Sequence, residues 1–222
     1  MSVIDKFSLA GKTAIVTGGE GMIGRMICET IKELGGTAIS VDVLGPAPVD
    51  ITVFTDCLRL ADHPCDILIN NAVGNQKPSH NYANRWRQDL DIGLTGALNM
   101  IQVCSDQLRK RRGVILNMGS DLSLIAPTQA LYPQGQVKPL SYSVVKHGII
   151  GMTRYFAALW PEVRCNALCP GGVDVGQKMP AIPLGRLARL DELQGPIAFL
   201  ISDASSYVTG AALVVDGGRT CI

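Results

Sequence analysis

The chain has 222 residues, of which 47% are hydrophobic and 18% charged, and its formal net charge is +1. This composition can bury a core, so it excludes a disordered chain, and the near-neutral charge gives no electrostatic signature for nucleic acid or an acidic membrane surface. The length predicts a single domain over residues 1–222. Residues 1–7 do not resemble a signal peptide and no apolar run could span a bilayer, so we expect a cytoplasmic protein with no membrane partner.

Strand-like and helix-like segments alternate along the chain. The pattern predicts strands at residues 12–17, 37–42, 66–70, 113–118, 163–168 and 211–215. Helices are predicted at residues 22–34, 82–110, 141–160 and 191–202. Strands that are apolar throughout and separated by helices indicate a parallel sheet covered on both faces, which is a doubly wound α/β domain. Such a sheet binds its ligand at the carboxyl ends of its strands.

A glycine-rich turn, Thr17-Gly-Gly-Glu-Gly-Met-Ile-Gly24, joins the first strand to the first helix. Glycines allow the backbone to approach a pyrophosphate, and the helix N-terminus offers free N–H groups. Asp42 ends the second strand, where its carboxylate can accept hydrogen bonds from ribose hydroxyls and would repel a 2′-phosphate. No Lys or Arg lies in the turn or directly after Asp42. These features predict dinucleotide binding, with NAD favoured over NADP; the alternative is a purely structural turn.

Tyr142 and Lys146 stand four residues apart, which places them on one face of a helix. A nearby ammonium, or the positive charge of a nicotinamide, lowers the pKa of a phenol from its ordinary value near 10. Such a phenol can exchange a proton with a carbonyl or alcohol oxygen. Lys146 could also hold ribose hydroxyls, and Ser120, at a strand end, is well placed to bond a substrate oxygen. The alternative is a surface tyrosine and a solvated lysine.

In combination, these residues resemble the short-chain dehydrogenase/reductase family along essentially the whole chain. The matching pieces are the glycine turn, Asp42, Val49-Asp50-Ile51, Asn70-Asn71-Ala72, Ser120, Tyr142 with Lys146, Asn166-Ala-Leu-Cys-Pro-Gly171 and Val214-Val-Asp-Gly-Gly218. The resemblance implies a Rossmann-type sheet with NAD(P) at its carboxyl edge. It also implies that Tyr142 is the acid/base, Ser120 positions the substrate oxygen and Lys146 anchors the ribose.

The resemblance further implies a set of residues that contact the cofactor. In the glycine turn these are Gly18, Met22, Ile23 and Gly24. Asp42 would bind the adenosine ribose, and Asp50 and Ile51 would contact the adenine. The remaining positions would line the cofactor or lie near the nicotinamide: Asn71, Ala72, Pro170, Gly171 and Val173. No metal is implied, since the His residues and the seven cysteines lack metal-ligand spacing, and we expect Cys165 and Cys169 to be buried.

The chain departs from the family pattern at several positions. Met22 stands where a glycine is usual, and Val73 comes between Asn70-Asn71-Ala72 and Gly74. Gly93 stands where the family usually has the Asn of a catalytic tetrad, which is thought to hold a water linked to the lysine. A backbone carbonyl at Gly93 could still hold that water, so the proton relay is in question.

Ser120 and Tyr142 are also separated by more residues than usual. The additional segment, residues 131–139, predicts a loop over the substrate pocket that carries Gln134, Gln136 and Lys138. Tyr132, in the same segment, has no lysine four residues later and is a poor rival to Tyr142.

Three connections are short for this family: residues 42–50, 50–66 and 177–183. Either the native protein is longer than 222 residues, or its adenine edge and substrate pocket are unusually open. Intact mass distinguishes these alternatives.

Segments 120–127, 138–146 and 216–221 look like those of bacterial oxidoreductases in flagellin glycosylation and surface-sugar pathways. The leading hypothesis is therefore an NAD(H)-dependent oxidoreductase that acts on a carbonyl or secondary alcohol of a small polar, sugar-derived substrate. The alternative, motivated by Gly93, is a catalytically weak dinucleotide-binding partner subunit. A homodimer or homotetramer is expected, because the helices at 82–110 and 141–160 form subunit contacts in the family. Trp86, in the first of these helices, is predicted to be a packing residue.

Overall fold

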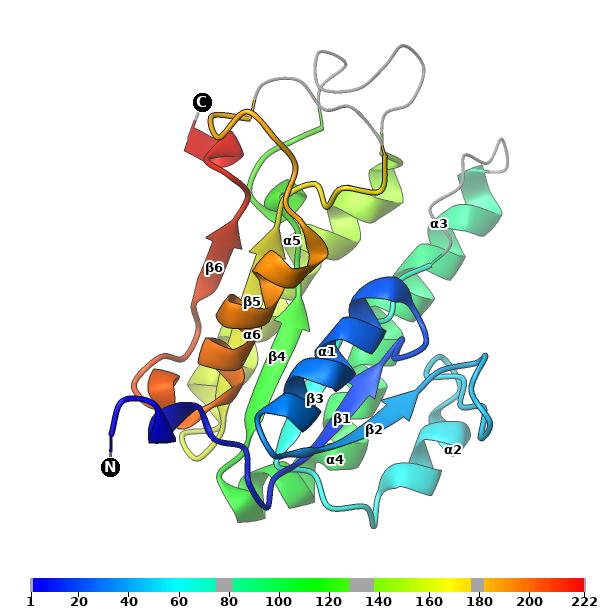
Figure 1. Ribbon diagram of the computed structural model, residues 1–222. Coiled ribbons are helices and arrows are strands. Elements are labelled where there is room, and N and C mark those ends of the chain that lie inside the picture. The colour runs from blue at the N-terminus through cyan, green and yellow to red at the C-terminus, as the bar shows by residue number, and fades with distance from the viewer. Residues whose placement is uncertain (1, 75–81, 128–137, 177–181, 222) are drawn as a thin grey trace.

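The protein forms one parallel sheet (Figure 1), and the computed structural model describes residues 2–74, 82–127, 138–176 and 182–221. The strands are β1 (Thr13–Thr17), β2 (Thr37–Val41), β3 (Ile67–Asn70), β4 (Val114–Met118), β5 (Arg164–Pro170) and β6 (Ala212–Val215). They pair in the order β2-β1-β3-β4-β5-β6, and every pairing is parallel. The predicted doubly wound α/β fold and all six predicted strands are therefore confirmed.

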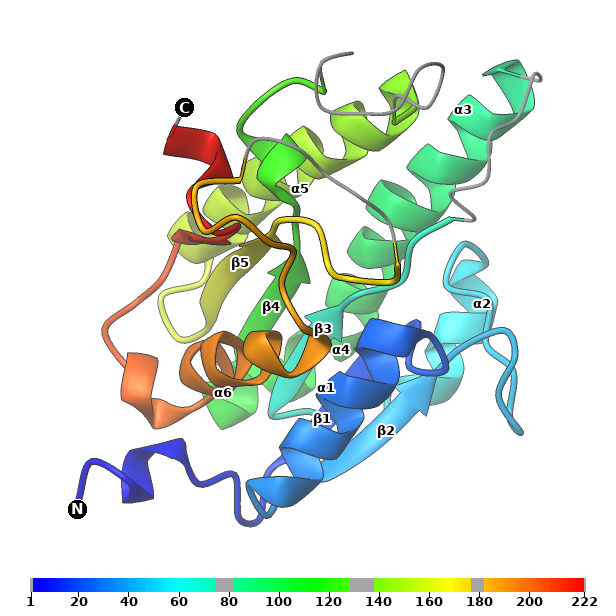
Figure 2. The same cartoon turned by 45° about the horizontal axis from the view of Figure 1, so that its top comes forward.

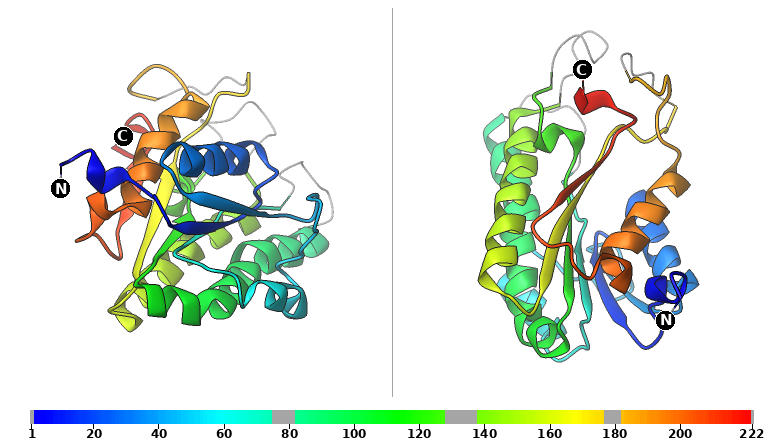
Figure 3. Two further views of the ribbon diagram at one scale, coloured as in Figure 1. Left: turned by 60° about the horizontal axis from the view of Figure 1, so that its bottom comes forward. Right: turned by 90° about the vertical axis from the view of Figure 1, so that its left-hand side faces the viewer.

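Helices cover both faces of the sheet (Figure 3). On one face lie α1 (Met22–Glu33) and α6 (Gln194–Ile201), and on the other lie α4 (Ala97–Arg111) and α5 (Leu140–Leu159). Each layer between helices and sheet has its own buried apolar cluster. Because both faces are covered, every residue of β3 and β4 is buried, which explains why these strands are apolar throughout rather than alternating.

The long helix predicted at 82–110 is interrupted. It consists of α3 (Tyr82–Leu90), a π-helical segment at Asp91–Gly96 and then α4. The π segment contains Gly93, and π segments within helices often mark functional sites. Trp86 on α3, predicted to be a packing residue, is 39% exposed, so its side chain is only partly covered by the residues that the structure describes.

The connection after β2 is short, as predicted. Residues 42–53 contain neither helix nor strand, and α2 (Phe54–Cys57) has only four residues.

The chain places β2 on one side of β1 and β3 on the other, so the connections after β1 and β3 diverge between these two strands. In doubly wound sheets this divergence leaves a crevice at the carboxyl edge, which is where ligands bind. Figure 2 brings that edge forward, and the first turns of α3 and α5 extend beyond it.

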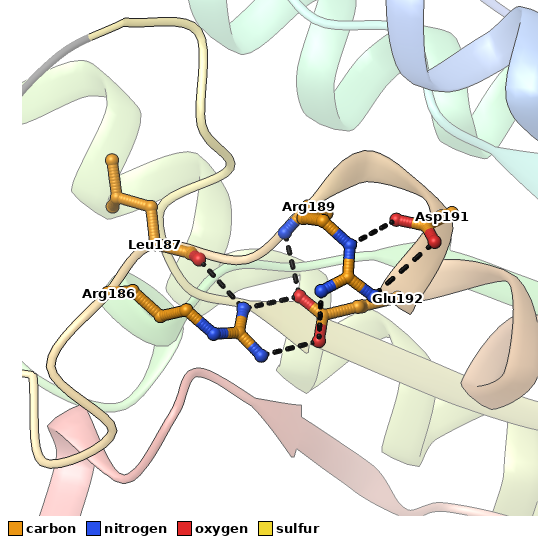
Figure 4. A network of polar contacts seen from close by, with 5 residues as sticks. All are labelled: Arg186, Leu187, Arg189, Asp191 and Glu192. Atoms are coloured by element: carbon orange, nitrogen blue, oxygen red, sulfur yellow. Dashed lines mark hydrogen bonds and ion pairs between the residues drawn. The ribbon is translucent and has the colours of Figure 1, made fainter.

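The segment between β5 and α6 is held by an ion-pair network (Figure 4). The Arg186 guanidinium donates to both Glu192 carboxylate oxygens, at 2.6 and 2.7 Å, and the Arg189 backbone N–H donates to the same carboxylate at 2.8 Å. The hydrogen bonds from Arg186 are the main reason that the pKa of Glu192 falls to about 2. These groups are solvent-exposed, so the network orders a loop rather than stabilising the core.

Six of the seven cysteines are buried, including Cys165 and Cys169 as predicted, and only Cys221 is exposed. Burial raises the pKa of the Cys165 thiol to about 12, which makes it an inert core group. Across the described residues, no three His, Cys, Asp or Glu side chains gather as metal ligands do. None of the described helices combines the length and apolar character needed to cross a membrane.

Candidate functional site

The glycine turn is built by close backbone approach between the ends of β1 and β3. Gly18 has φ +64°, and a Cβ there would lie 2.8 Å from the Ala72 Cα, so only glycine fits. A Cβ at Gly24 would lie 2.0 Å from the Gly18 carbonyl oxygen, which brings the start of α1 directly against the turn. The Asn71 side chain donates to the Thr17 and Gly18 carbonyls at 3.0 and 3.1 Å and so braces the turn.

Met22, the departure from the family turn, is the first residue of α1 and is 47% exposed. Gly21 takes the N-cap position in front of it, and the Gly21 N–H donates to the Gly18 carbonyl at 3.2 Å. Ile23 is half-buried and packs against the core cluster beneath α1. The turn therefore closes with its glycine one residue earlier than the family pattern, and the helix N-terminus still faces the carboxyl edge of the sheet.

Asp42 lies at the end of β2 with its carboxylate fixed by backbone donors. Its Oδ2 accepts from the Glu20 N–H at 3.1 Å, and its Oδ1 accepts from the Leu44 N–H at 3.0 Å. Asp42 lines a cavity of about 510 Å³ at the crevice between the diverging connections. Four other predicted cofactor residues line the same cavity: Gly18, Asp50, Ile51 and Ala72.

A second, much smaller cavity adjoins the first at the carboxyl edge. Its lining includes Tyr142, Lys146 and Gly93. The two cavities share Ile51, Ala72, Val73 and Ile92. The residues predicted to bind the adenosine and those predicted to handle the proton therefore line two adjoining cavities.

Lys146 is a buried cation one helical turn beyond Tyr142. Its Nζ lies 5.7 Å from the Tyr142 ring centroid and donates to the Met118 carbonyl at 2.6 Å. Only 6% of the residue is exposed. Burial lowers its pKa to about 8; Cys169 opposes that shift and Lys138 adds to it.

Ser120 is held by its neighbours and does not line the cavity beside Tyr142. Its hydroxyl donates to the Asp121 Oδ1 at 2.8 Å, and it accepts from the Leu122 N–H at 3.2 Å. Asp121 is paired in turn with the buried guanidinium of Arg219. This Ser120–Asp121–Arg219 chain was not predicted, because nothing in the sequence links residues 98 positions apart.

Packing against Val145 explains why Gly93 stands where the family usually has the asparagine of the tetrad. A Cβ at this position would lie 2.3 Å from the Val145 Cγ1, so α5 leaves no space for a side chain. The Lys146 ammonium instead has the Met118 carbonyl as its hydrogen-bond acceptor.

Several predicted positions lie apart from the two cavities. Pro170 ends β5, the Gly171 N–H donates to the Val215 carbonyl at 2.9 Å, and Val173 forms a bridge with Ala188. None of the three lines either cavity, although all follow β5 at the carboxyl edge. The predicted loop residues Tyr132, Gln134 and Gln136, and residues 177–181, lie outside the described residues.

Comparisons with known proteins show which family and fold the chain shares. A family model described as "Enoyl-(Acyl carrier protein) reductase" matches residues 5–220. The chain is 28% identical over 257 residues to 2-dehydro-3-deoxy-D-gluconate 5-dehydrogenase of Bacillus subtilis (96% of each chain), and 29% identical over 263 residues to galactitol 2-dehydrogenase of Rhizobium johnstonii (100% of each). It is 30% identical over 259 residues to cis-4-hydroxycyclohexanecarboxylate dehydrogenase of Sinomonas cyclohexanicum, covering 97% of this chain and 99% of the relative.

Solved structures extend the likeness to the fold. A gluconate 5-dehydrogenase from Burkholderia cenocepacia, in complex with NADP and tartrate, has a TM-score of 0.85 at 25% identity, with all of both chains covered. A short-chain dehydrogenase from Leptospira borgpetersenii with bound NAD+ has a TM-score of 0.86 at 28% identity, covering 99% of this chain and 96% of the other.

Proposed function

Because the chain belongs to the short-chain dehydrogenase/reductase family, we propose that it is an NAD(H)-dependent oxidoreductase that interconverts a secondary alcohol and a carbonyl on a small polar substrate. The observation that carries the proposal is that Asp42 lines one cavity, Tyr142 and Lys146 line a second, and the two cavities share four lining residues. The cradle at Gly18, which a Cβ would fill, and the cavity of about 510 Å³ fit a dinucleotide. When bound, the nicotinamide supplies or accepts the hydride.

Tyr142 performs the proton transfer in this proposal. During alcohol oxidation its phenolate takes the proton from the substrate hydroxyl, and during carbonyl reduction its phenol returns it. The Lys146 ammonium, 5.7 Å from the ring centroid, stabilises the phenolate through space. The Met118 carbonyl fixes the Lys146 ammonium, which leaves its other protons for the ribose hydroxyls. The Ser120 hydroxyl donates its own proton to Asp121, so its oxygen is left to accept a hydrogen bond from the substrate hydroxyl.

NAD is the proposed cofactor and NADP the less favoured one. Asp42 and Asp50 line the cavity predicted for the adenosine, and Asp91 adds a third carboxylate. A 2′-phosphate placed among these carboxylates would be repelled, whereas ribose hydroxyls can donate to Asp42. The solved relatives include one with NADP and one with NAD+, so this preference rests on the residues of the chain itself.

The proposed substrate is a polyhydroxylated or sugar-derived alcohol. The names of the relatives include a galactitol dehydrogenase and dehydrogenases of gluconate derivatives, which supports this class. A role in flagellin glycosylation or surface-sugar pathways remains a prediction from the sequence. The alternative of a catalytically weak partner subunit receives no support from these relatives, which are dehydrogenases by name.

We further propose a cytoplasmic homodimer or homotetramer. Exposed apolar side chains lie on the helices that were predicted to form subunit contacts. Those described on α3 and α4 are Trp86 and Leu98, and those on α5 are Leu140, Tyr155 and Leu159. Their exposure in the single chain is what an interface between copies would cover.

The proposal is tested by measuring turnover of NAD+ and NADP+ with a panel of polyols and sugar acids. NADH binding is measured separately through its fluorescence. Turnover that prefers NAD+ supports the proposal. Tight NADH binding without turnover of any alcohol or carbonyl would support the partner-subunit alternative instead.

A further inference from the structure

Lys138 is a cation at the catalytic tyrosine to which the reaction described above gives no role. It stands directly before the N-cap of α5, four residues before Tyr142, and its Nζ lies 5.1 Å from the Tyr142 ring centroid. Lys146, four residues after Tyr142, lies 5.7 Å from the same centroid. Two ammonium groups therefore lie close to the Tyr142 ring, and Lys138 directly precedes the end of α5 that projects beyond the carboxyl edge of the sheet (Figure 1).

The two buried arginines near the start of α5 have carboxylate partners, whereas the buried Lys146 donates to the Met118 carbonyl. Arg85 lies 3.3 Å from Asp89, whose other partner is the Ser141 hydroxyl at 2.5 Å. Arg219 is paired with Asp121. Both pairs are nearly inaccessible to solvent, so each cancels its own charge inside the protein.

Lys138, in contrast, has no carboxylate within ion-pair distance among the described residues. The residues that the structure does not describe, 1, 75–81, 128–137, 177–181 and 222, include no Asp or Glu, so none of their side chains can neutralise it. Burial lowers the pKa of Lys138, Arg85 lowers it further, and only Asp121 raises it. A half-buried ammonium beside the reacting tyrosine is therefore left without a counter-ion.

We propose that Lys138 is the specificity-determining residue for a substrate that carries an oxoanion, a carboxylate or a phosphate, close to the carbon that is oxidised or reduced. The inference rests on the proposed function, because it places this group in the substrate of the same site. Bound substrate supplies the missing counter-ion, and its oxoanion accepts charge-assisted hydrogen bonds from the ammonium. The positive charge over the Tyr142 ring also excludes cationic substrates.

The electrostatics give the inference a pH signature. The charged groups that face Lys138 are Arg85, Asp121 and Lys146. Since burial and Arg85 depress its pKa, the ammonium loses its proton at a lower pH than an ordinary lysine. Affinity for an oxoanion should therefore fall as pH rises through that lowered pKa. Affinity for a neutral polyol should not depend on the protonation state of Lys138.

The experiment uses matched pairs of an acid and its neutral polyol from three to six carbons, glycerate with glycerol through to gluconate with glucitol, together with glucitol 6-phosphate. Turnover with NAD+ is measured for the wild type, Lys138→Met, Lys138→Arg and Lys110→Met, which removes the same charge from an exposed position on α4.

In the best pair, the charged member should exceed the polyol in kcat/KM by about ten- to a hundredfold, the worth of a charge-assisted hydrogen bond. Lys138→Met should remove that preference, and Lys138→Arg and Lys110→Met should keep it. The oxoanion is identified by which charged group, the carboxylate or the phosphate, raises kcat/KM above that of the neutral polyol.

Equal use of acid and polyol, or a preference that survives in Lys138→Met, would overturn the inference. A loss of activity in Lys138→Met that is equal for both members, with a shifted pH profile, would assign Lys138 to the tyrosine instead. Acid binding to the enzyme–NADH complex, followed by nicotinamide fluorescence, separates the two proposals. Lys138-dependent binding without turnover would uphold the oxoanion site and contradict the oxidoreductase, and neither binding nor turnover would contradict both. Thermal melting of each variant verifies folding.

Discussion

Gly93 and Val145 are matched across the contact between the π-helical segment and α5. A Cβ at Gly93 would lie 2.3 Å from the Val145 Cγ1, a distance that real Cβ contacts do not adopt. Val145 directly precedes Lys146, so any side chain at position 93 would displace the turn of α5 that carries Lys146. The packing of this chain therefore excludes an asparagine side chain at position 93.

This relationship predicts a reversal of sign in a double-mutant cycle. Gly93→Ala alone should destabilise the protein by roughly 1–3 kcal/mol, the usual cost of overpacking. In a Val145→Ala background the same change should be neutral or stabilising, since alanine is the better helix former once space exists. Denaturant unfolding of the four proteins measures the coupling. Additive effects would show that Val145 does not occupy that space.

Replacing Asp42 should change the choice of cofactor. Asp42→Ala removes the acceptor for the ribose hydroxyls and the charge that repels a 2′-phosphate. NADH affinity should fall by about ten- to a hundredfold and NADPH affinity should rise. Fluorescence titration with both nucleotides measures the ratio, and Glu33→Gln, which removes a charge on the exposed side of α1, is the control. An unchanged ratio would contradict the role of Asp42.

The buried Lys146 makes stability depend on pH. Its pKa falls from the ordinary 10.5 to about 8 on folding, so at pH below 8 the folded protein carries the cost of burying a charge. Between pH 8 and 10.5 the folded state releases this proton before the unfolded state does, and wild-type stability should gain over that range. Lys146→Met lacks this term, so its stability relative to wild type should decline as pH rises through the same window. Chemical denaturation at a series of pH values measures this, and a constant difference would contradict it.

Arg219 should be far more important for stability than Arg186, although both form close ion pairs. Arg219→Met would leave Asp121 buried without its partner, at a cost of about 3–5 kcal/mol. Arg186→Met breaks an exposed network and should cost less than about 1 kcal/mol. Because the Asp121 carboxylate accepts the Ser120 hydroxyl, Arg219→Met should also reduce turnover. Equal stability losses in the two variants would contradict this view of the buried pair.

The sequence predicted the sheet well because its central strands β3 and β4 are buried on both faces and are therefore apolar runs. It also predicted that Asp42, Asp50, Tyr142 and Lys146 would meet at one edge, since the carboxyl ends of parallel strands converge there. The π segment at Asp91–Gly96 was not predictable, because a helix with one extra residue in a turn keeps almost the same hydrophobic pattern.

Contacts between residues far apart in the chain were the other feature that the sequence did not predict. Ser120 was predicted to lie at the end of a strand and follows β4 by two residues, but its engagement with Asp121 depends on Arg219 and on the path of the chain after β6. Lys138 was noted only as a polar loop residue, because its isolation from carboxylates is a property of the folded environment. The exposure of Trp86 likewise depends on what covers α3, which a helical pattern does not specify.

The most direct test of the account compares turnover by the wild type and Tyr142→Phe on the best substrate of the panel, with NADH affinity measured on both proteins. Phenylalanine keeps the ring close to Lys138 and Lys146 and removes only the oxygen proposed to exchange the proton. The account predicts a fall in kcat of roughly 10²–10⁴-fold with NADH affinity unchanged. Turnover that persists at the wild-type rate in Tyr142→Phe would contradict it.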